Sequence, residues 1–226
     1  MLDKKTKENF NEQRYADSPL GLPDRERVKI ILELVGSGKS VLDVGCGNGE
    51  IGKLLIGNNN KVSGLDISET CVKKANKSRV TAVVCDLETE DVPFKEKFDV
   101  ILAAEVIEHI VDTDVFLKKI YKSLKSDGIL VLTTPNLASF GRRLLLLVNK
   151  NPHMEVSLEK YSAGHSRYFI KATLGWLLEK NGFEVVDFRS DVVNFNSSGT
   201  LRSVLLAKLV PTLGKSLILK CIKKKL

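Results

Sequence analysis

Residues 41–49, with the sequence VLDVGCGNG, constrain the fold of this chain more than any other segment. Three apolar side chains around one acid, Asp43, predict a buried strand that carries a carboxylate. The strand runs directly into three glycines at alternate positions, Gly45, Gly47 and Gly49. Glycine adopts turn conformations that a Cβ atom obstructs, and it lets the backbone approach a ligand closely. The segment therefore predicts a strand that ends in a ligand-binding turn.

The charge of this turn bears on the chemistry of its ligand. Residues 47–52, GNGEIG, fit the GxGxxG pattern in which the amides of a helix N-terminus face a pyrophosphate. However, the carboxylates of Asp43 and Glu50 would repel a pyrophosphate and attract a ligand that carries an ammonium and a sulfonium. S-adenosylmethionine is such a ligand. A nucleotide-dependent oxidoreductase remains an alternative, because the glycine pattern alone is weak.

An acid-bearing strand followed by GxGxG resembles the first motif of class I S-adenosylmethionine-dependent methyltransferases. A second strand, residues 61–66, ends in Asp66, where a carboxylate can accept both ribose hydroxyls. Asp66 could instead cap the helix that starts near Ser68, although Ser68 could cap that helix itself. A third apolar run ends at Asp86, where this family places an acid against the adenine amino group. The resemblance implies a set of cofactor-binding residues: Asp43, Gly45, Cys46, Gly47, Gly49, Asp66, Ile67, Asp86, Leu87 and Glu105.

Strand and helix patterns alternate along the chain, which predicts an α/β fold with a parallel sheet. The resemblance specifies a doubly wound, mostly parallel seven-stranded sheet with helices on both faces, the Rossmann-like methyltransferase fold. Helices are expected over residues 24–35, 50–56, 69–77, 113–124 and 170–180. Strands are expected over residues 41–44, 61–66, 80–84, 98–104, 129–133, 183–188 and 203–209, the last in an antiparallel edge pair.

Length and composition predict a single domain over residues 1–226, since 43% hydrophobic residues suffice for a sizeable core, and the resemblance implies that it is a methyltransferase domain. Within it we expect an N-terminal arm (1–23), a substrate-side insertion (136–168) and a basic amphipathic tail (210–226). The charged N-terminus and the absence of a long apolar run predict neither a signal peptide nor a transmembrane helix. Four cysteines without a CxxC pair suggest reduced thiols and a cytoplasmic protein.

The net charge of +7 is confined to the C-terminal end of the chain. Seven basic residues and no acid follow residue 192, whereas the preceding part holds 28 of each sign. A nucleic-acid partner is therefore not expected, because it needs basic residues on the catalytic face. Apolar residues recur at helical spacing in the tail between lysines, so we expect either a helix on an anionic membrane or a helix packed on the domain.

Catalysis by methyl transfer needs a positioned nucleophile and, in many cases, a base that removes its proton. His109 follows the fourth strand, and His165 lies in the segment GHSRYF before a helix. Both are candidate catalytic bases, although His109 could simply pack at a helix start. His153 is a weaker candidate.

A cation site is a further hypothesis for the same region. Glu105, Glu108 and His109 would share one face if their segment were an α-helix, with His165 arriving from elsewhere. The ExxEH string resembles that of metal-assisted O-methyltransferases, among them quinone-pathway enzymes and enzymes that methylate the 2′-hydroxyl of RNA ends. Mg²⁺ there would lower the pKa of a substrate hydroxyl. Metal-free relatives carry similar residues, and Glu108 could be exposed.

Together with the resemblance, these features predict methyl transfer to an oxygen of a small-molecule or lipid-linked acceptor. Arg14 and Tyr15 are expected to close over the cofactor carboxylate, and the apolar run of residues 142–148 to cover the substrate pocket. An apolar cover and a membrane-surface tail suit a lipid-like acceptor and peripheral membrane contact. The alternatives are a metal-assisted RNA 2′-O-methyltransferase, a nucleotide-dependent oxidoreductase and a non-catalytic cofactor binder.

Overall fold

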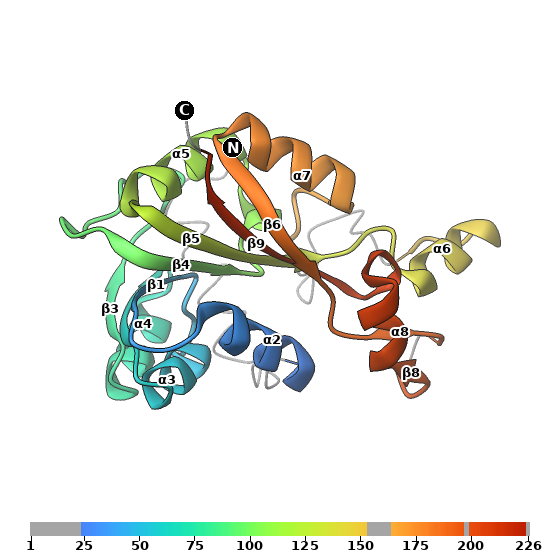
Figure 1. Ribbon diagram of the computed structural model, residues 1–226, viewed down its shortest axis with the longest axis horizontal. Helices are drawn as coiled ribbons and strands as arrows, with labels where there is room; N and C mark the ends of the chain where they lie inside the picture. Colours follow the sequence, from blue (N-terminus) through green and yellow to red (C-terminus); the bar gives the residue numbers. More distant parts are fainter. Residues whose placement is uncertain (1–23, 153–163, 197–198, 225–226) are drawn as a thin grey trace.

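A seven-stranded sheet in the order β3-β2-β1-β4-β5-β9-β6 forms the centre of the protein (Figure 1). The computed structural model describes residues 24–152, 164–196 and 199–224. Neighbouring strands are parallel except where β9 pairs with β5 and β6. This arrangement confirms the predicted fold class. The strands are β1 (Ser40–Val44), β2 (Lys61–Asp66), β3 (Thr81–Val84), β4 (Phe98–Ala104), β5 (Leu124–Pro135), β6 (Phe183–Arg189) and β9 (Ser216–Lys223).

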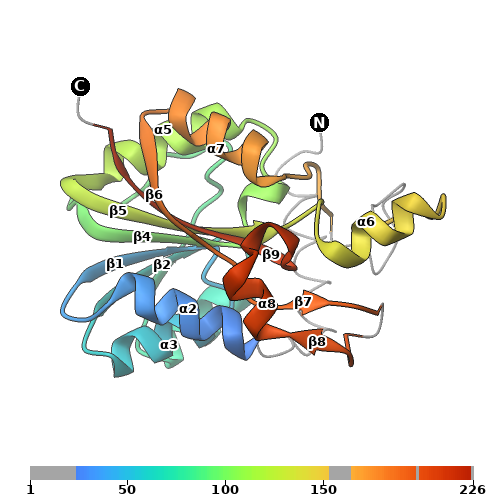
Figure 2. The same cartoon turned by 45° about the vertical axis from the view of Figure 1, so that its right-hand side comes forward.

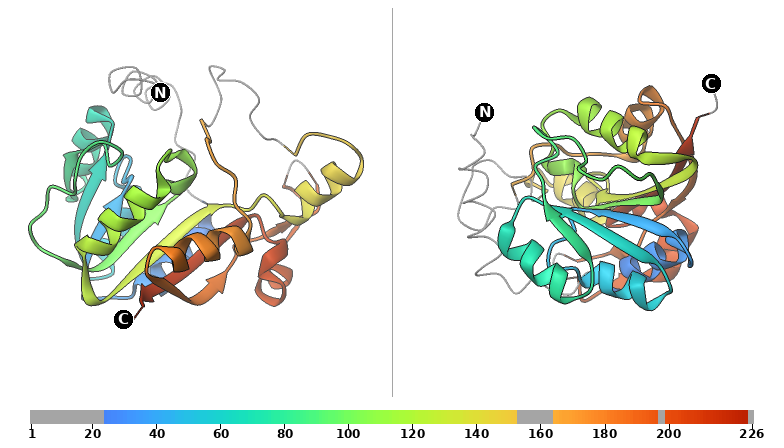
Figure 3. Two further views of the ribbon diagram at one scale, coloured as in Figure 1. Left: turned by 90° about the horizontal axis from the view of Figure 1, so that it is seen from above. Right: turned by 90° about the vertical axis from the view of Figure 1, so that its left-hand side faces the viewer.

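Helices cover both faces of the sheet (Figures 1 and 3). One face carries α2 (Arg25–Val35), α3 (Glu50–Gly57) and α4 (Glu69–Lys77), and the other carries α5 (Thr113–Ser123) and α7 (Lys171–Lys180). Each layer has its own buried apolar cluster between helices and sheet. All five helices expected from the sequence are confirmed.

Short polar side chains fix where several of these helices begin. The Asp24 carboxylate accepts the Glu26 amide at the start of α2, and the Ser68 hydroxyl accepts the Cys71 amide at the start of α4. Such side-chain caps satisfy amide groups that have no partner inside the helix. Because Ser68 caps α4, Asp66 is not required for that task.

The C-terminal region differs from the sequence-based prediction. Residues 203–209, expected to be the last strand, form a helix, α8 (Val204–Leu209), which Ser203 caps. The expected amphipathic tail helix is also wrong: after a 3-10 turn, η2 (Pro211–Leu213), the chain enters β9. Leu217, Ile218 and Leu219 are fully buried there. A strand buried on both faces reads as a continuous apolar run, and periodicity alone does not separate such a run from a buried helix.

A small group of elements extends beyond the carboxyl end of β5 (Figure 2). It contains α6 (Phe140–Leu147), a hairpin of β7 (Val193–Asn194) and β8 (Arg202–Ser203), and α8 with η2. The rings of Phe140 and Phe195 pack edge to face at 5.4 Å between centroids and join α6 to the hairpin. We call residues 136–152, 193–196 and 199–215 the α6/α8 lobe. Within the described residues no helix is long and apolar enough to cross a membrane.

Candidate active site

The glycine turn after β1 lies at the carboxyl edge of the sheet. Gly45 and Gly47 both have positive φ, 68° and 51°, and a Cβ on Gly45 would lie 2.5 Å from a methyl of Val106. Space is open around Gly47 on its Cβ side. Gly49 precedes α3 in a left-handed conformation, and Cys46 is buried, with burial as the main reason that its thiol pKa is raised. The turn therefore requires glycine and exposes backbone toward a ligand.

Asp66, at the end of β2, ties this turn to the next helix. Its Oδ2 accepts the Gly47 amide at 2.8 Å, and its Oδ1 accepts the Ser68 amide at 2.9 Å. A carboxylate accepts several hydrogen bonds at once, so these two amides do not exclude ribose hydroxyls as further donors. Ile67, half-buried, follows it along the chain.

Asp43 is a buried acid behind the turn, with 2% of its surface exposed. Burial and, second, the negative charge of Asp66 raise its pKa to about 7. Its Oδ2 has no hydrogen-bond partner among the described residues. A buried carboxylate in this state takes up a proton or attracts a cation, which suits the ammonium of a ligand.

Asp86 and Leu87 follow β3 at the same edge of the sheet. The Oδ1 of Asp86 accepts the Glu88 amide at 2.9 Å, whereas its Oδ2 is buried without a hydrogen bond in the described structure. Leu87 is buried in the cluster on the α5 side. Asp86 therefore has an acceptor available for a donor such as an adenine amino group.

Glu105 does not join the group that its spacing suggested. It has a positive φ of 58°, and the helical turn after it, η1 (Ile107–His109), is a short 3-10 helix rather than an α-helix. One carboxylate oxygen lies 2.9 Å from Arg27 in α2, and the other accepts the Thr133 hydroxyl. The prediction that Glu105 shares a helical face with Glu108 and His109 is therefore wrong.

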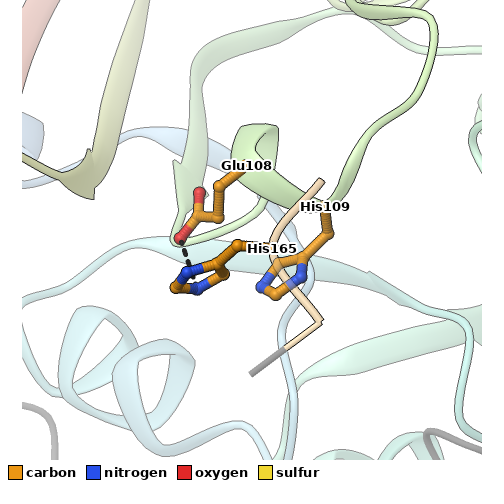
Figure 4. Close-up of side chains that lie close together, drawn as sticks. All are labelled: Glu108, His109 and His165. Atoms are coloured by element: carbon orange, nitrogen blue, oxygen red, sulfur yellow. Dashed lines mark ion pairs between the residues drawn. The ribbon is translucent and has the colours of Figure 1, made fainter. Parts of the chain in front are cut away.

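Glu108, His109 and His165 do come together, although His165 is 56 residues further along the chain than His109 (Figure 4). The Oε1 of Glu108 lies 4.0 Å from Nε2 of His165, and the two imidazole rings are 5.0 Å apart. Glu108 is 1% exposed, which overturns the alternative of a solvated acid. Burial and, second, the charge of Glu105 raise its pKa.

Backbone contacts hold His165 next to Glu108. The amides of Ser166 and Arg167 both donate to the Glu108 carbonyl, at 2.9 and 3.1 Å. The Arg167 guanidinium donates to the carbonyls of Ile110 and Val111. His109 Nδ1 contacts the Gly164 carbonyl at 3.1 Å. These positioning contacts could not be predicted from the sequence, because the acceptors are backbone carbonyl groups, which carry no sequence signal.

The donor atoms of the three residues lie within 4.8 Å of one another and could hold a cation. Two imidazoles and one carboxylate favour a transition metal such as Zn²⁺ or Fe²⁺ over Mg²⁺, which prefers oxygen ligands. The buried Oε1 of Glu108 has no hydrogen-bond partner in the described part of the chain, which fits a site for a cation or for a protonated imidazole.

Other expected features lie elsewhere. Arg14, Tyr15 and His153 fall outside the described residues. The side chains of residues 144 and 146–148, in the run expected to cover the substrate pocket, are exposed. A groove of about 580 Å³ opens between α7 and the lobe, but none of the predicted cofactor or catalytic residues lines it.

The fold and the glycine-turn site define a class I methyltransferase, the class that uses S-adenosylmethionine. The chain matches the methyltransferase-domain family over residues 13–187 and belongs to that family. The family supports the methyltransferase interpretation of the glycine turn over the dinucleotide interpretation.

Similar proteins include two curated relatives and one solved structure. A ubiquinone biosynthesis O-methyltransferase of Bradyrhizobium diazoefficiens is 37% identical over 103 residues, 44% of this chain and 41% of the relative. The mitochondrial ubiquinone biosynthesis O-methyltransferase of Bos taurus is 30% identical over 66% of this chain and 42% of the relative. The matches thus span about two fifths of these relatives. The CcbJ methyltransferase of Streptomyces caelestis shares the fold, with 15% identity and a TM-score of 0.70 over 99% of this chain and 100% of CcbJ.

Proposed function

We propose that this protein transfers a methyl group from S-adenosylmethionine to a hydroxyl of a small-molecule or lipid-linked acceptor. The observation that carries the proposal is that the acid-lined glycine turn and the Glu108–His109–His165 cluster follow β1 and β4, which are adjacent parallel strands. In open α/β sheets, ligands bind outside the carboxyl ends of the strands. The names of the two curated relatives support a hydroxyl acceptor of the quinol type.

In this proposal the cofactor lies across the ends of β1, β2 and β3. Asp43 faces the ammonium, the backbone of the turn from Gly45 to Gly49 cradles the methionine portion, and Asp66 accepts the ribose hydroxyls. Asp86 accepts the adenine amino group beside Leu87 and Ile67. Cys46 lies within this turn, and Glu105 follows β4, where it forms an ion pair with Arg27.

Methyl transfer then requires an acceptor oxygen in line with the sulfonium. The oxygen forms the new bond to the methyl carbon, the carbon–sulfur bond breaks, and the hydroxyl proton passes to an imidazole. If His109 donates from Nδ1 to the Gly164 carbonyl, the lone pair of its other ring nitrogen can take that proton. The Glu108 carboxylate, 4.0 Å from His165, would stabilise a positive charge on that ring.

A divalent cation held by Glu108, His109 and His165 is the metal-assisted version of the same proposal. When bound, it would lower the pKa of the acceptor hydroxyl. The residues that bind the cofactor are the same in both versions.

The test is methyl transfer from labelled S-adenosylmethionine to a panel of phenols, quinols and polar lipids, with and without a chelator. We expect a methyl ether and S-adenosylhomocysteine in equal amounts, with a loss of about 100-fold or more in kcat for His165→Ala or His109→Ala. Both variants should keep their affinity for S-adenosylhomocysteine, which separates lost chemistry from lost folding.

Methylation at nitrogen or carbon only, or full activity of both histidine variants, would contradict the proposal. A chelator-sensitive reaction that Zn²⁺ or Fe²⁺ restores would support the metal-assisted version. A chelator-insensitive reaction would support the histidine base.

A further inference from the structure

Helix α6 exposes apolar side chains to an unusual degree. It buries none of its eight residues, and its outer side continues beyond its end with the side chain of Val148. Leu146 and Leu147 are 57% and 82% exposed. Most helices in proteins are stabilised by packing an apolar face against the remainder of the molecule. The outer side of α6 has no such packing partner within the described structure.

Helix α8 and the residues before it expose a second apolar row. Leu201, Leu205 and Leu209 are spaced by four residues and are each more than 60% exposed. Residues four apart lie on one side of an α-helix, so Leu205 and Leu209 form a stripe along α8. Two exposed apolar helices therefore belong to one lobe.

The charges of this lobe have a single sign. Residues 136–152 and 192–226 contain no aspartate or glutamate. Arg143, Lys150, Lys208 and Lys215 are exposed, and none of the ion pairs between described residues involves them. Arg202 lies 4.0 Å from an acid outside the lobe, Asp24. Protein surfaces that bind anionic lipid typically combine exposed apolar side chains with cations that form no ion pair, and this lobe has both.

The lobe is also in a position to dock. Figures 1 and 2 both show α6 as the outermost element at its end of the molecule, with α8 and the β7–β8 hairpin next to it. Its inner side adjoins the active site: the half-buried Arg142 in α6 interacts electrostatically with Tyr168 and Glu105. The ring of Tyr168 lies 6.0 Å from that of His165.

We propose that the α6/α8 lobe is a membrane-docking surface that binds an anionic lipid bilayer. The leucines of α6 and α8 enter the interfacial region, and the flanking lysines and arginines contact lipid phosphates. A second copy of this chain is disfavoured as the occupant, because a symmetric contact would bring two acid-free surfaces together. The surface replaces the C-terminal tail that the sequence suggested for this role, since β9 is buried in the sheet.

The test uses sedimentation of the full chain with vesicles of phosphatidylglycerol mixed with phosphatidylcholine, and with phosphatidylcholine alone. We expect binding to the anionic vesicles only, and weaker binding at high salt. The double variants Leu147→Glu/Leu209→Glu and Lys150→Glu/Lys208→Glu should each lose about tenfold or more in partition. The matched variants Leu54→Glu and Lys53→Glu, which change exposed residues of α3, should bind as the unaltered protein does.

A second measurement reports contact directly. The four native cysteines are buried, so Leu147→Cys offers an exposed thiol for an environment-sensitive dye. Its emission should shift to the blue on anionic vesicles, whereas that of Leu54→Cys should not.

Equal binding by the lobe variants and the α3 variants, or no binding to anionic vesicles, would overturn the proposal. A lobe variant that converts a stable dimer into a monomer in light scattering would also overturn it and assign the surface to a second copy. None of these readouts depends on methyl transfer, so this proposal and the proposed function can fail separately.

Discussion

At the residue scale, two aspartates at the carboxyl edge of the sheet have different surroundings. Asp66 accepts backbone amides on both carboxylate oxygens, whereas Asp43 has a buried oxygen without a hydrogen-bond partner among the described residues. Asp66 therefore organises the glycine turn before any ligand arrives, and a cationic ligand would stabilise the charged form of Asp43, which burial disfavours.

Replacing Asp66 with alanine should weaken binding of S-adenosylhomocysteine by about 10- to 100-fold, because charge-assisted hydrogen bonds contribute about 1.5–3 kcal/mol. Titration calorimetry measures the change. The matched control is Asp99→Asn, at the opposite end of the sheet, where the carboxylate contacts Ser40 and Lys125. That variant should lose stability but keep its cofactor affinity; equal affinity losses in both variants would contradict the assigned role of Asp66.

The raised pKa of Asp43 should make the free energy of unfolding of the ligand-free protein depend on pH. Its folded pKa of about 7 lies above the ordinary value, so its protonated form favours the folded state at low pH. Stability from this group is then lost as pH rises from about 4 to about 7. Asp43→Asn removes that loss, and the variant should be more stable than the unaltered protein at about pH 8, by about 1–3 kcal/mol. Denaturant unfolding at several pH values measures this difference, which should shrink toward about pH 4.

The same variant should bind the cofactor less well, since it cannot ionise. Affinity of the unaltered protein for S-adenosylhomocysteine should fall by about tenfold between about pH 7.5 and pH 5.5, and the affinity of Asp43→Asn should stay flat. A flat profile for both proteins would show that Asp43 does not face the ligand cation.

At the element scale, the sequence predicted five helices and six of the seven strands but not the last strand. Capping residues and apolar periodicity locate α2 and α4 well, because local interactions define their ends. The run from Leu217 to Leu219 is apolar on every position, and only the sheet decides that it pairs with β5 and β6. The prediction that Glu105 belongs to the cation site was also wrong. Its left-handed backbone conformation breaks the helical spacing on which that prediction depended.

A substitution at a core position of β9 tests whether this segment is a buried strand and not a surface helix. Leu219→Ala should lower the free energy of unfolding by about 2–5 kcal/mol, since it opens a cavity in the apolar cluster between the sheet and helices α5 and α7. Leu209→Ala in α8, where the side chain is 71% exposed, should change it by less than about 0.5 kcal/mol. Denaturant unfolding without lipid compares the two. If both variants changed the free energy of unfolding by a similarly small amount, β9 would not be part of the core.

At the scale of the whole molecule, the parallel sheet gathers the site. Asp43, Asp66 and Asp86 meet at one edge because β1, β2 and β3 are neighbouring parallel strands, and each acid lies near the carboxyl end of its strand. This part of the site could be predicted from the sequence, since each acid stands at or just past the end of an apolar strand pattern. The approach of His165 to Glu108 could not be derived in the same way, because the contacts that bring them together are made by backbone carbonyls.

The proposed function depends most on the acid-lined turn, which should select S-adenosylmethionine and reject a dinucleotide. Calorimetric titration of the full chain with S-adenosylhomocysteine and, separately, with NAD tests it directly. We predict saturable binding of S-adenosylhomocysteine at one site and no measurable binding of NAD, since Asp43 and Glu50 repel a pyrophosphate. Tighter binding of NAD, or no heat from S-adenosylhomocysteine, would contradict this selectivity of the turn.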